Sequence, residues 1–151
     1  MSVIGVKRVD HVSFTVGDLD RSVAFFGRFG LTPLKSYRSE GPDVDEGTAT
    51  KNASMDITWL RLPHAEGPML ELIRYRNYPA QRSALNSRVG AAHVCFEVHD
   101  VRGAYGTLRA DGVEFVSEPH TDDAGTQWVY MRDPDGNVVE LIEEPSSDSG
   151  S

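Results

Sequence analysis

Two histidines and two glutamates of this sequence recur in matching positions and could together bind a divalent metal ion. His11 and His93 each begin a copy of the pattern H-V-x-F-x-V-x-D. Glu71 and Glu140 lie in the short apolar runs MLELI and VVELI, where an ionised carboxylate is costly without a positive partner. Imidazole and carboxylate groups suit zinc, nickel, cobalt, iron or manganese. We therefore expect these four side chains to share one divalent ion.

An internal duplication relates the two pairs. A second block repeats after the first, and its matched residues are Trp59 with Trp128, Gly67 with Gly136, and Glu71 with Glu140. Self-similarity of this kind indicates two copies of one structural unit. A single strand histidine or buried glutamate is more often a hydrogen-bonded or ion-paired core residue than a ligand. It is the duplication that favours a metal site.

Each copy has the pattern of a strand, a helix and three further strands. Alternating apolar residues over 9–16 predict a strand, and Asp18 is placed to cap a helix that ends near Gly30. The equivalent helix of the second copy begins at Asp100 and ends near Gly112. The remaining strands are expected at 31–38, 55–63, 68–75, 113–118, 126–132 and 137–143. The sequence thus predicts an α+β fold of two tandem βαβββ modules.

The boundaries of the modules follow from these elements. The first module is expected at 7–76 and the second at 91–144, with a linker at 77–90 and a loose tail at 145–151. Extra residues of the first copy form the polar, glycine-bearing stretch 36–55. This stretch predicts a long loop over the site, as a lid or an interface.

The faces of the strands place further residues beside the four expected ligands. Each helix must cover the Val/Phe/Val face of its module, so the histidines point to the opposite face. Cys95 should share that face with His93, as a small filler residue rather than a nucleophile. Glu97 is there too, as a solvated carboxylate or a second acid or base. Strand alternation gives the expected pocket lining as Ser13, Thr15, Trp59, Met69, Cys95, Trp128 and Tyr130.

Composition excludes several classes of partner. The chain has 151 residues, of which 39% are hydrophobic and 25% charged, which is typical of one globular domain. Its formal charge of −8 and the lack of a basic run argue against binding to nucleic acid or anionic lipid. Neither a bilayer-spanning apolar stretch nor an export signal is evident, and one cysteine permits no internal disulfide. We therefore expect a cytoplasmic protein with a small-molecule partner.

These patterns, together with DPDGNVVELIE near the end, resemble the vicinal oxygen chelate superfamily of glyoxalases, bleomycin resistance proteins and extradiol dioxygenases. The resemblance covers residues 7–144 and treats them as one vicinal oxygen chelate domain. It implies that the modules form a curled, incomplete mixed β-barrel with the helices outside. It also implies a homodimer and a substrate whose oxygens chelate the metal.

Within that superfamily, the set His11, Glu71, His93 and Glu140 is similar to the ligands of bacterial glyoxalase I. The likeness implies a metal-dependent isomerase or lyase that acts through an enediolate-type intermediate, with either Glu140 or Glu71 as the base. The Arg and Asn with which glyoxalase I binds the glutathione carboxylate are not found, and position 75, four residues past Glu71, is tyrosine, which disfavours lactoylglutathione as the substrate.

Two alternatives stay open. An Fe(II)-dependent extradiol-type dioxygenase would use only His11, His93 and Glu140 as ligands. A resistance protein would sequester or modify a toxic small molecule.

Overall fold

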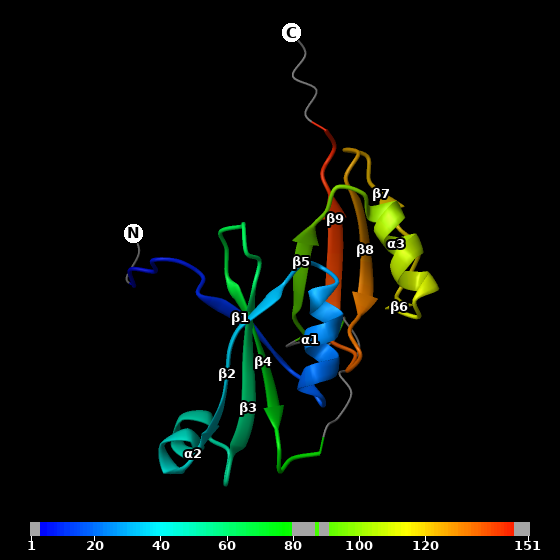
Figure 1. Ribbon diagram of the computed structural model, residues 1–151. Coiled ribbons are helices and arrows are strands. Elements are labelled where there is room, and N and C mark those ends of the chain that lie inside the picture. The colour runs from blue at the N-terminus through cyan, green and yellow to red at the C-terminus, as the bar shows by residue number, and fades with distance from the viewer. Residues whose placement is uncertain (1–3, 80–86, 88–90, 147–151) are drawn as a thin grey trace. The chain divides into compact units, whose positions relative to one another are not determined.

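The strands and helices that the repeat predicts are present in both copies, in an α+β chain of two mixed sheets (Figure 1). The computed structural model describes residues 4–79, 87 and 91–146. The chain divides into two compact units, Met1–Gln81 and Arg82–Ser151. Most of the expected linker at 77–90 and of the expected tail at 145–151 lies outside the described residues.

The first unit is a βαβββ-like module with one added helix. Its elements are β1 (His11–Thr15), α1 (Leu19–Gly27), β2 (Thr32–Glu40), α2 (Pro42–Thr48), β3 (Ser54–Arg61) and β4 (Met69–Tyr75). The strands lie in the order β1-β4-β3-β2, with β1 parallel to β4 and the other neighbours antiparallel. The sheet is open in this order, so β1 and β2 are its edges.

The second unit repeats the plan. Its elements are β5 (His93–Glu97), α3 (Val101–Ala110), β6 (Glu114–Phe115), β7 (His120–Thr121), β8 (Gln127–Arg132) and β9 (Val138–Glu143). The strand order is β5-β9-β8-β6, and β7 also pairs with β8. The single strand expected at 113–118 is therefore only partly correct, because β6 covers two residues and β7 follows as a separate short strand.

The helix signals in the sequence act as predicted. The Asp18 carboxylate accepts a hydrogen bond from the Arg21 N–H at 3.0 Å, and the Asp100 carboxylate accepts one from the Gly103 N–H at 2.8 Å. Gly112, just after α3, has a φ of 88°, a left-handed conformation that costs glycine little. Both helices therefore begin at the repeated Asp, and α3 ends just before Gly112, whereas α1 ends at Gly27, three residues before Gly30.

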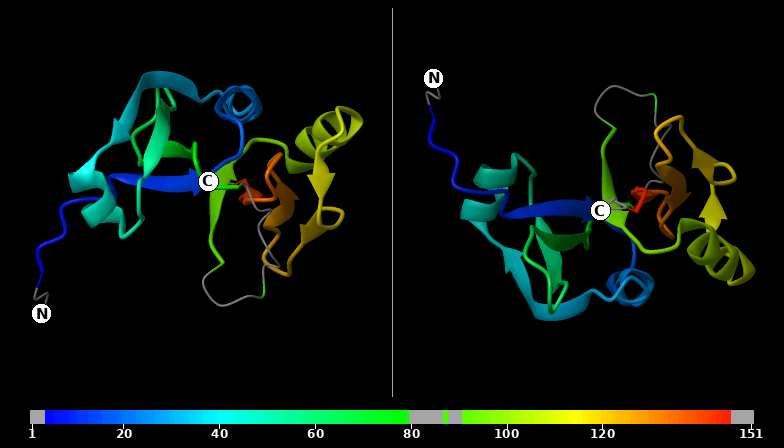
Figure 2. Two further views of the ribbon diagram at one scale, coloured as in Figure 1. Left: turned by 90° about the horizontal axis from the view of Figure 1, so that it is seen from below. Right: turned by 90° about the horizontal axis from the view of Figure 1, so that it is seen from above.

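Each helix covers one face of its own sheet. α1 packs on β3 and β4, and α3 packs on β8 and β9 (Figure 2). The Phe14 and Phe26 rings stack with centroids 6.1 Å apart, which fixes the Val/Phe/Val face of β1 beneath α1. The buried residues of α1 are Ser22, Phe25 and Phe26.

The stretch 36–55, expected to be a long loop, is mostly ordered secondary structure. β2 continues to Glu40 and pairs with β3 as far as Ser54. α2 then begins with a proline at its first turn, where the missing N–H costs no hydrogen bond. The Asp45 carboxylate accepts hydrogen bonds from the N–H groups of Asn52 and Ala53, both at 2.7 Å. The prediction of a loop was wrong because ladder pairing with β3 orders these polar residues.

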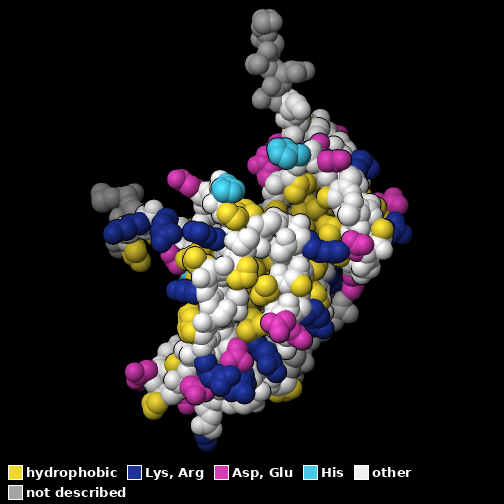
Figure 3. Space-filling view, viewed as in Figure 1, with side chains coloured by type: hydrophobic (Ala, Val, Ile, Leu, Met, Phe, Trp, Pro, Cys, Tyr) yellow, Lys and Arg dark blue, Asp and Glu magenta, His cyan; other side chains and the backbone are white. Residues whose placement is uncertain are grey.

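The described surface carries mixed charge. Figure 3 shows basic and acidic side chains interspersed over one face, with no broad patch of a single sign. On β3, Asp56 has ion pairs with Arg38, Arg74 and Arg76, at 2.9, 3.9 and 3.5 Å. In the described part of the chain, no helix has the length and apolar character needed to span a membrane.

The β8–β9 turn gives a first prediction. Asp133 is 2% exposed, and its carboxylate accepts hydrogen bonds from the N–H groups of Asp135 and Asn137 at 2.9 and 2.8 Å. Burial raises the pKa of this carboxyl group. Asp133→Ala leaves two N–H donors of a part-buried turn without their acceptor, so we expect a loss of about 2–4 kcal/mol in the free energy of unfolding. Urea denaturation of both proteins measures it.

Asp122 is the matched control for this prediction. Its carboxylate accepts hydrogen bonds from the N–H groups of Ala124 and Thr126, at 2.9 and 3.0 Å, but the turn is exposed. Water can replace the lost acceptor there, so Asp122→Ala should cost about 0.5–1 kcal/mol. Equal costs for the two variants would mean that burial does not set the importance of Asp133.

Candidate functional site

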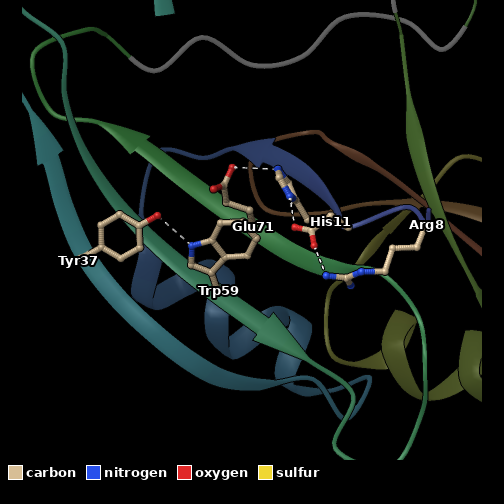
Figure 4. A network of polar contacts seen from close by, with 6 residues as sticks. Arg8, His11, Tyr37, Trp59 and Glu71 are labelled. Atoms are coloured by element: carbon tan, nitrogen blue, oxygen red, sulfur yellow. Dashed lines mark hydrogen bonds and ion pairs between the residues drawn. The ribbon is translucent and has the colours of Figure 1, made fainter. Parts of the chain in front are cut away.

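In the first unit, neighbouring strands bring one predicted histidine and one predicted glutamate together. Ser13 of β1 stands opposite Glu71 of β4, and His11 precedes Ser13 by two residues on the same face. The His11 Nε2 lies 3.9 Å from the Glu71 Oε1 (Figure 4), and the Glu71 side chain is only 12% exposed. The parallel pairing of β1 with β4 thus produces a half-site of one imidazole and one nearly buried carboxylate.

The second unit contains the equivalent half-site. Cys95 of β5 stands opposite Glu140 of β9, and His93 again lies two residues earlier. The His93 Nε2 donates a hydrogen bond to the Glu140 Oε2 at 2.9 Å, and the Glu140 side chain is 15% exposed. All four predicted ligands are therefore found as two His–Glu pairs, one in each unit.

An aromatic ring supports each histidine. Trp59 stands opposite Glu71, and its ring lies 4.7 Å from the His11 ring at 78°. Tyr130 stands opposite Glu140, and its ring lies 5.2 Å from the His93 ring, also at 78°. These edge-to-face contacts restrict the rotation of the imidazoles.

The structural equivalent of Trp59 is consequently Tyr130, and the sequence match of Trp59 with Trp128 does not hold in the sheets. Trp128 stands opposite Ile142, two rungs away from Glu140, and packs against Tyr130 with ring centroids 5.5 Å apart. The turn between β8 and β9 is shorter than that between β3 and β4. A single sequence offset therefore cannot align both strands of the β3–β4 hairpin with both strands of the β8–β9 hairpin.

The other expected pocket residues divide between site and core. Ser13 shares the rung of Glu71, whereas Thr15 is paired two residues further along β4 with Ile73. Met69 packs against a core cluster formed by Met55, Ile57 and Trp59, so it is partly a core residue.

Cys95 is exposed and therefore fills no core position, but its thiol is not activated either. Partial burial and the neighbouring Glu140 carboxylate, to which the thiol is hydrogen-bonded, raise the pKa of Cys95 to about 12. The group is therefore a neutral thiol near pH 7, and a thiol is a poor nucleophile compared with a thiolate. Burial, followed by Glu140, also raises the pKa of Tyr130.

Sequence reasoning missed two polar groups beside His11. The His11 Nδ1 lies 3.0 Å from the Asp10 Oδ2, and the Arg8 Nη2 donates to the Asp10 Oδ1 at 2.6 Å. The hydrogen bond with His11 lowers the pKa of Asp10, and Arg8 acts in the same direction. The repeat could not reveal Asp10, because the second copy has Ala92 in that position.

It also missed a cation and a phenol on β2. The Lys35 Nζ lies 4.9 Å from the centroid of the Trp59 ring, and the Trp59 Nε1 donates to the Tyr37 hydroxyl at 3.2 Å. Lys35 pairs with Trp59, which in turn pairs with Glu71, so the three stand on one rung of the sheet. Both residues fall within the strand expected at 31–38, but nothing in the sequence marked them as part of the site.

The donor atoms of each pair fit a divalent ion in kind and in spacing. Two ligands at about 2.1 Å from one ion and about 90–109° apart are separated by about 3.0–3.4 Å. The 2.9 Å separation of the second pair lies close to that range, and the 3.9 Å separation of the first pair is longer than its upper end. Within the described residues, however, no group of three or more His, Cys, Asp or Glu side chains is near enough to hold a metal. Each pair by itself therefore offers two donor groups.

Comparison with known proteins agrees with this plan. The model of the Glyoxalase/Bleomycin resistance protein/Dioxygenase superfamily matches residues 8–141. A 2-epi-5-epi-valiolone epimerase from Actinomyces sp is 37% identical over 160 residues, which cover 94% of this chain and 82% of that protein. A lactoylglutathione lyase from Escherichia coli O157:H7 is 28% identical over 152 residues, or 95% and 97% of the two chains.

Among solved structures, a glyoxalase family protein from Bacillus cereus has the same fold. It superposes with a TM-score of 0.84 and 26% sequence identity, over 95% of this chain and 98% of its own.

Proposed function

The chain belongs to the glyoxalase, bleomycin resistance protein and dioxygenase superfamily, and on that premise we propose that it is a metal-dependent isomerase of small molecules with vicinal oxygens. The observation that carries the proposal is the duplicated His–Glu pair, in which a nearly buried carboxylate faces an imidazole Nε2. A buried carboxylate beside a cation site is suited to taking a proton from carbon and returning it.

We propose that His11, Glu71, His93 and Glu140 bind one divalent ion, which could be nickel, cobalt, zinc, manganese or iron. The pairs would come either from one chain or from two chains of a homodimer, in the incomplete β-barrel that the family resemblance implies. When bound, such an ion supplies Lewis acidity to a substrate carbonyl.

The side chains on the Glu71 face suggest how the substrate would be held. Glu71 or Glu140 holds the proton that moves, while the Trp59 and Tyr130 rings limit access of water to the two pairs. The Lys35 ammonium, on the rung of Trp59, is placed to bind a further substrate oxygen. This arrangement supports a substrate with several oxygen substituents.

The relatives favour isomerisation. An epimerase inverts a stereocentre, which a carboxylate can do by removing and returning one proton. The most similar relative cited above is named as such an enzyme. Glutathione conjugates are less well supported, because Tyr75 packs against the core cluster of Met55, Ile57 and Trp59 and supplies no cation.

Metal analysis of protein purified without a histidine tag tests this proposal. We expect about one divalent ion per chain, and less than about a tenth of that in His11→Ala or His93→Ala, because each variant removes one of four donors. His64→Ala and His99→Ala are matched controls, since both histidines are exposed and lie outside the pairs. Full metal content in both ligand variants would refute the proposed centre.

A further inference from the structure

The two half-sites differ in what holds the histidine. In the first unit, His11 uses its Nδ1 to contact Asp10, and Asp10 is in turn held by Arg8 (Figure 4). In the second unit, Ala92 stands before His93 and has no side-chain acceptor. The duplication therefore supplied both halves with a His and a Glu, but among the residues that the structure describes only the first half has a carboxylate behind the imidazole.

For neutral imidazoles, the contacts favour opposite tautomers in the two halves. An ionised carboxylate can only accept hydrogen bonds, so His11 must donate from Nδ1 to Asp10. The Nε2 of neutral His11 then carries a lone pair, and it lies 3.9 Å from Glu71, which is too long for a hydrogen bond. His93 instead contacts the Glu140 carboxylate through its Nε2 at 2.9 Å, a geometry that favours a proton on Nε2.

This difference matters for binding a metal through Nε2. His11 already presents its lone pair beside a carboxylate, whereas His93 must first move its proton to Nδ1. A carboxylate that accepts the second N–H of a ligating histidine fixes the ring and its tautomer, and its loss typically weakens metal binding 10–100-fold. The Asp10 carboxylate has that position relative to His11.

We propose that Asp10 is a positioning residue, which presets the tautomer of His11 and makes His11–Glu71 the preorganised half of the metal site. The proposal rests on the proposed function as far as the metal is concerned. Arg8 contributes by holding the second Asp10 oxygen, and it leaves the Oδ2 directed at the imidazole. Both side chains are at least half exposed, so their ion pair adds little to folding stability.

The first experiment determines the histidine tautomers without any metal. Long-range 15N–1H NMR spectra of the chelator-treated full chain at pH 8 should show His11 protonated on Nδ1 and His93 protonated on Nε2. In Asp10→Ala, His11 should lose this preference, while Asp10→Asn should keep it because the amide oxygen still accepts a hydrogen bond. An Nε2-protonated His11 in the wild type would overturn the inference.

The second experiment measures metal affinity by competition with a chromophoric chelator, using Ni²⁺ and Zn²⁺. Asp10→Ala should bind about 10–100-fold more weakly than the wild type, and Asp10→Asn should recover part of that loss. Asp123→Ala removes the same charge from an exposed turn and should bind like the wild type. Unchanged affinity in Asp10→Ala would refute the role of Asp10 in metal binding.

The two measurements separate the inference from its premise. If the wild type binds neither metal, the proposed function fails and so does the preorganised half, but the NMR spectra still decide whether Asp10 sets the tautomer of His11. If the wild type binds metal and the Asp10→Ala spectra are unchanged, the premise stands and the positioning role of Asp10 is wrong.

Discussion

If Glu71 and not Glu140 is the base, Glu71→Gln should lower kcat for proton transfer by about 10²–10⁴ while the protein keeps most of its metal. Glutamine preserves the size and one ligating oxygen of the side chain, but it cannot accept a proton from carbon. The measurement is exchange of the substrate C–H with deuterated solvent, followed by NMR. A first substrate to use is 2-epi-5-epi-valiolone, the compound named for the relative with 37% identity.

Two further variants make this result specific. Glu66→Gln removes the same charge from an exposed turn and should leave exchange unchanged. Glu140→Gln tests the second carboxylate, and the base is the glutamate whose replacement abolishes exchange with the metal retained. If both Gln variants lose exchange and metal together, the two carboxylates act mainly as ligands.

The same variant separates the competing functions. An extradiol-type dioxygenase needs only His11, His93 and Glu140, so Glu71→Gln should retain oxygen uptake when supplied with ferrous iron and ascorbate. A sequestering protein should keep its affinity for the bound molecule without turnover. Retained isomerase turnover with full metal content would contradict a central role for Glu71.

Much of this site could be predicted from sequence because duplication made weak signals visible. One histidine on a strand says little, but His11 and His93 repeat within an eight-residue frame, and Glu71 and Glu140 repeat within apolar runs. Because side chains alternate between the two faces of a strand, each histidine was predicted to lie on the face away from its helix, and the structure has it there. The pairing of His with Glu follows from the parallel contact of the first and last strands of each module.

The features that the sequence did not reveal are those that the two copies do not share. Asp10 and Lys35 have no counterparts detectable by the repeat, so nothing marked them as part of the site. α2 arose within the added stretch, where polar composition predicted a loop although backbone pairing with β3 stabilises a longer β2. The repeat matched Trp59 with Trp128 and not with Tyr130, because the two hairpin turns differ in length by two residues. This difference shifts the register without changing the apolar pattern.

A second large effect is expected when inactive variants are mixed. Equal amounts of His11→Ala and His93→Ala, exchanged by mild denaturation and refolding, should regain about a quarter of wild-type activity if the proposed homodimer shares its sites. Each His–Glu pair is complete on one sheet of its own unit, so a chain without His11 still offers an intact His93–Glu140 pair to a partner. Half of the dimers are then mixed, and one of their two sites is intact.

A chain that carries both His11→Ala and His93→Ala should instead lower the activity of wild type when the two are mixed. Mixed equally with wild type, the His11→Ala/His93→Ala double variant should reduce activity to about a quarter if sites are shared, because every site in a mixed dimer then lacks one histidine. If both pairs instead act within one chain, this mixture keeps about half of the activity and the mixture of single variants stays inactive. The two ratios together therefore assign the four donors to one chain or to two, whatever the substrate.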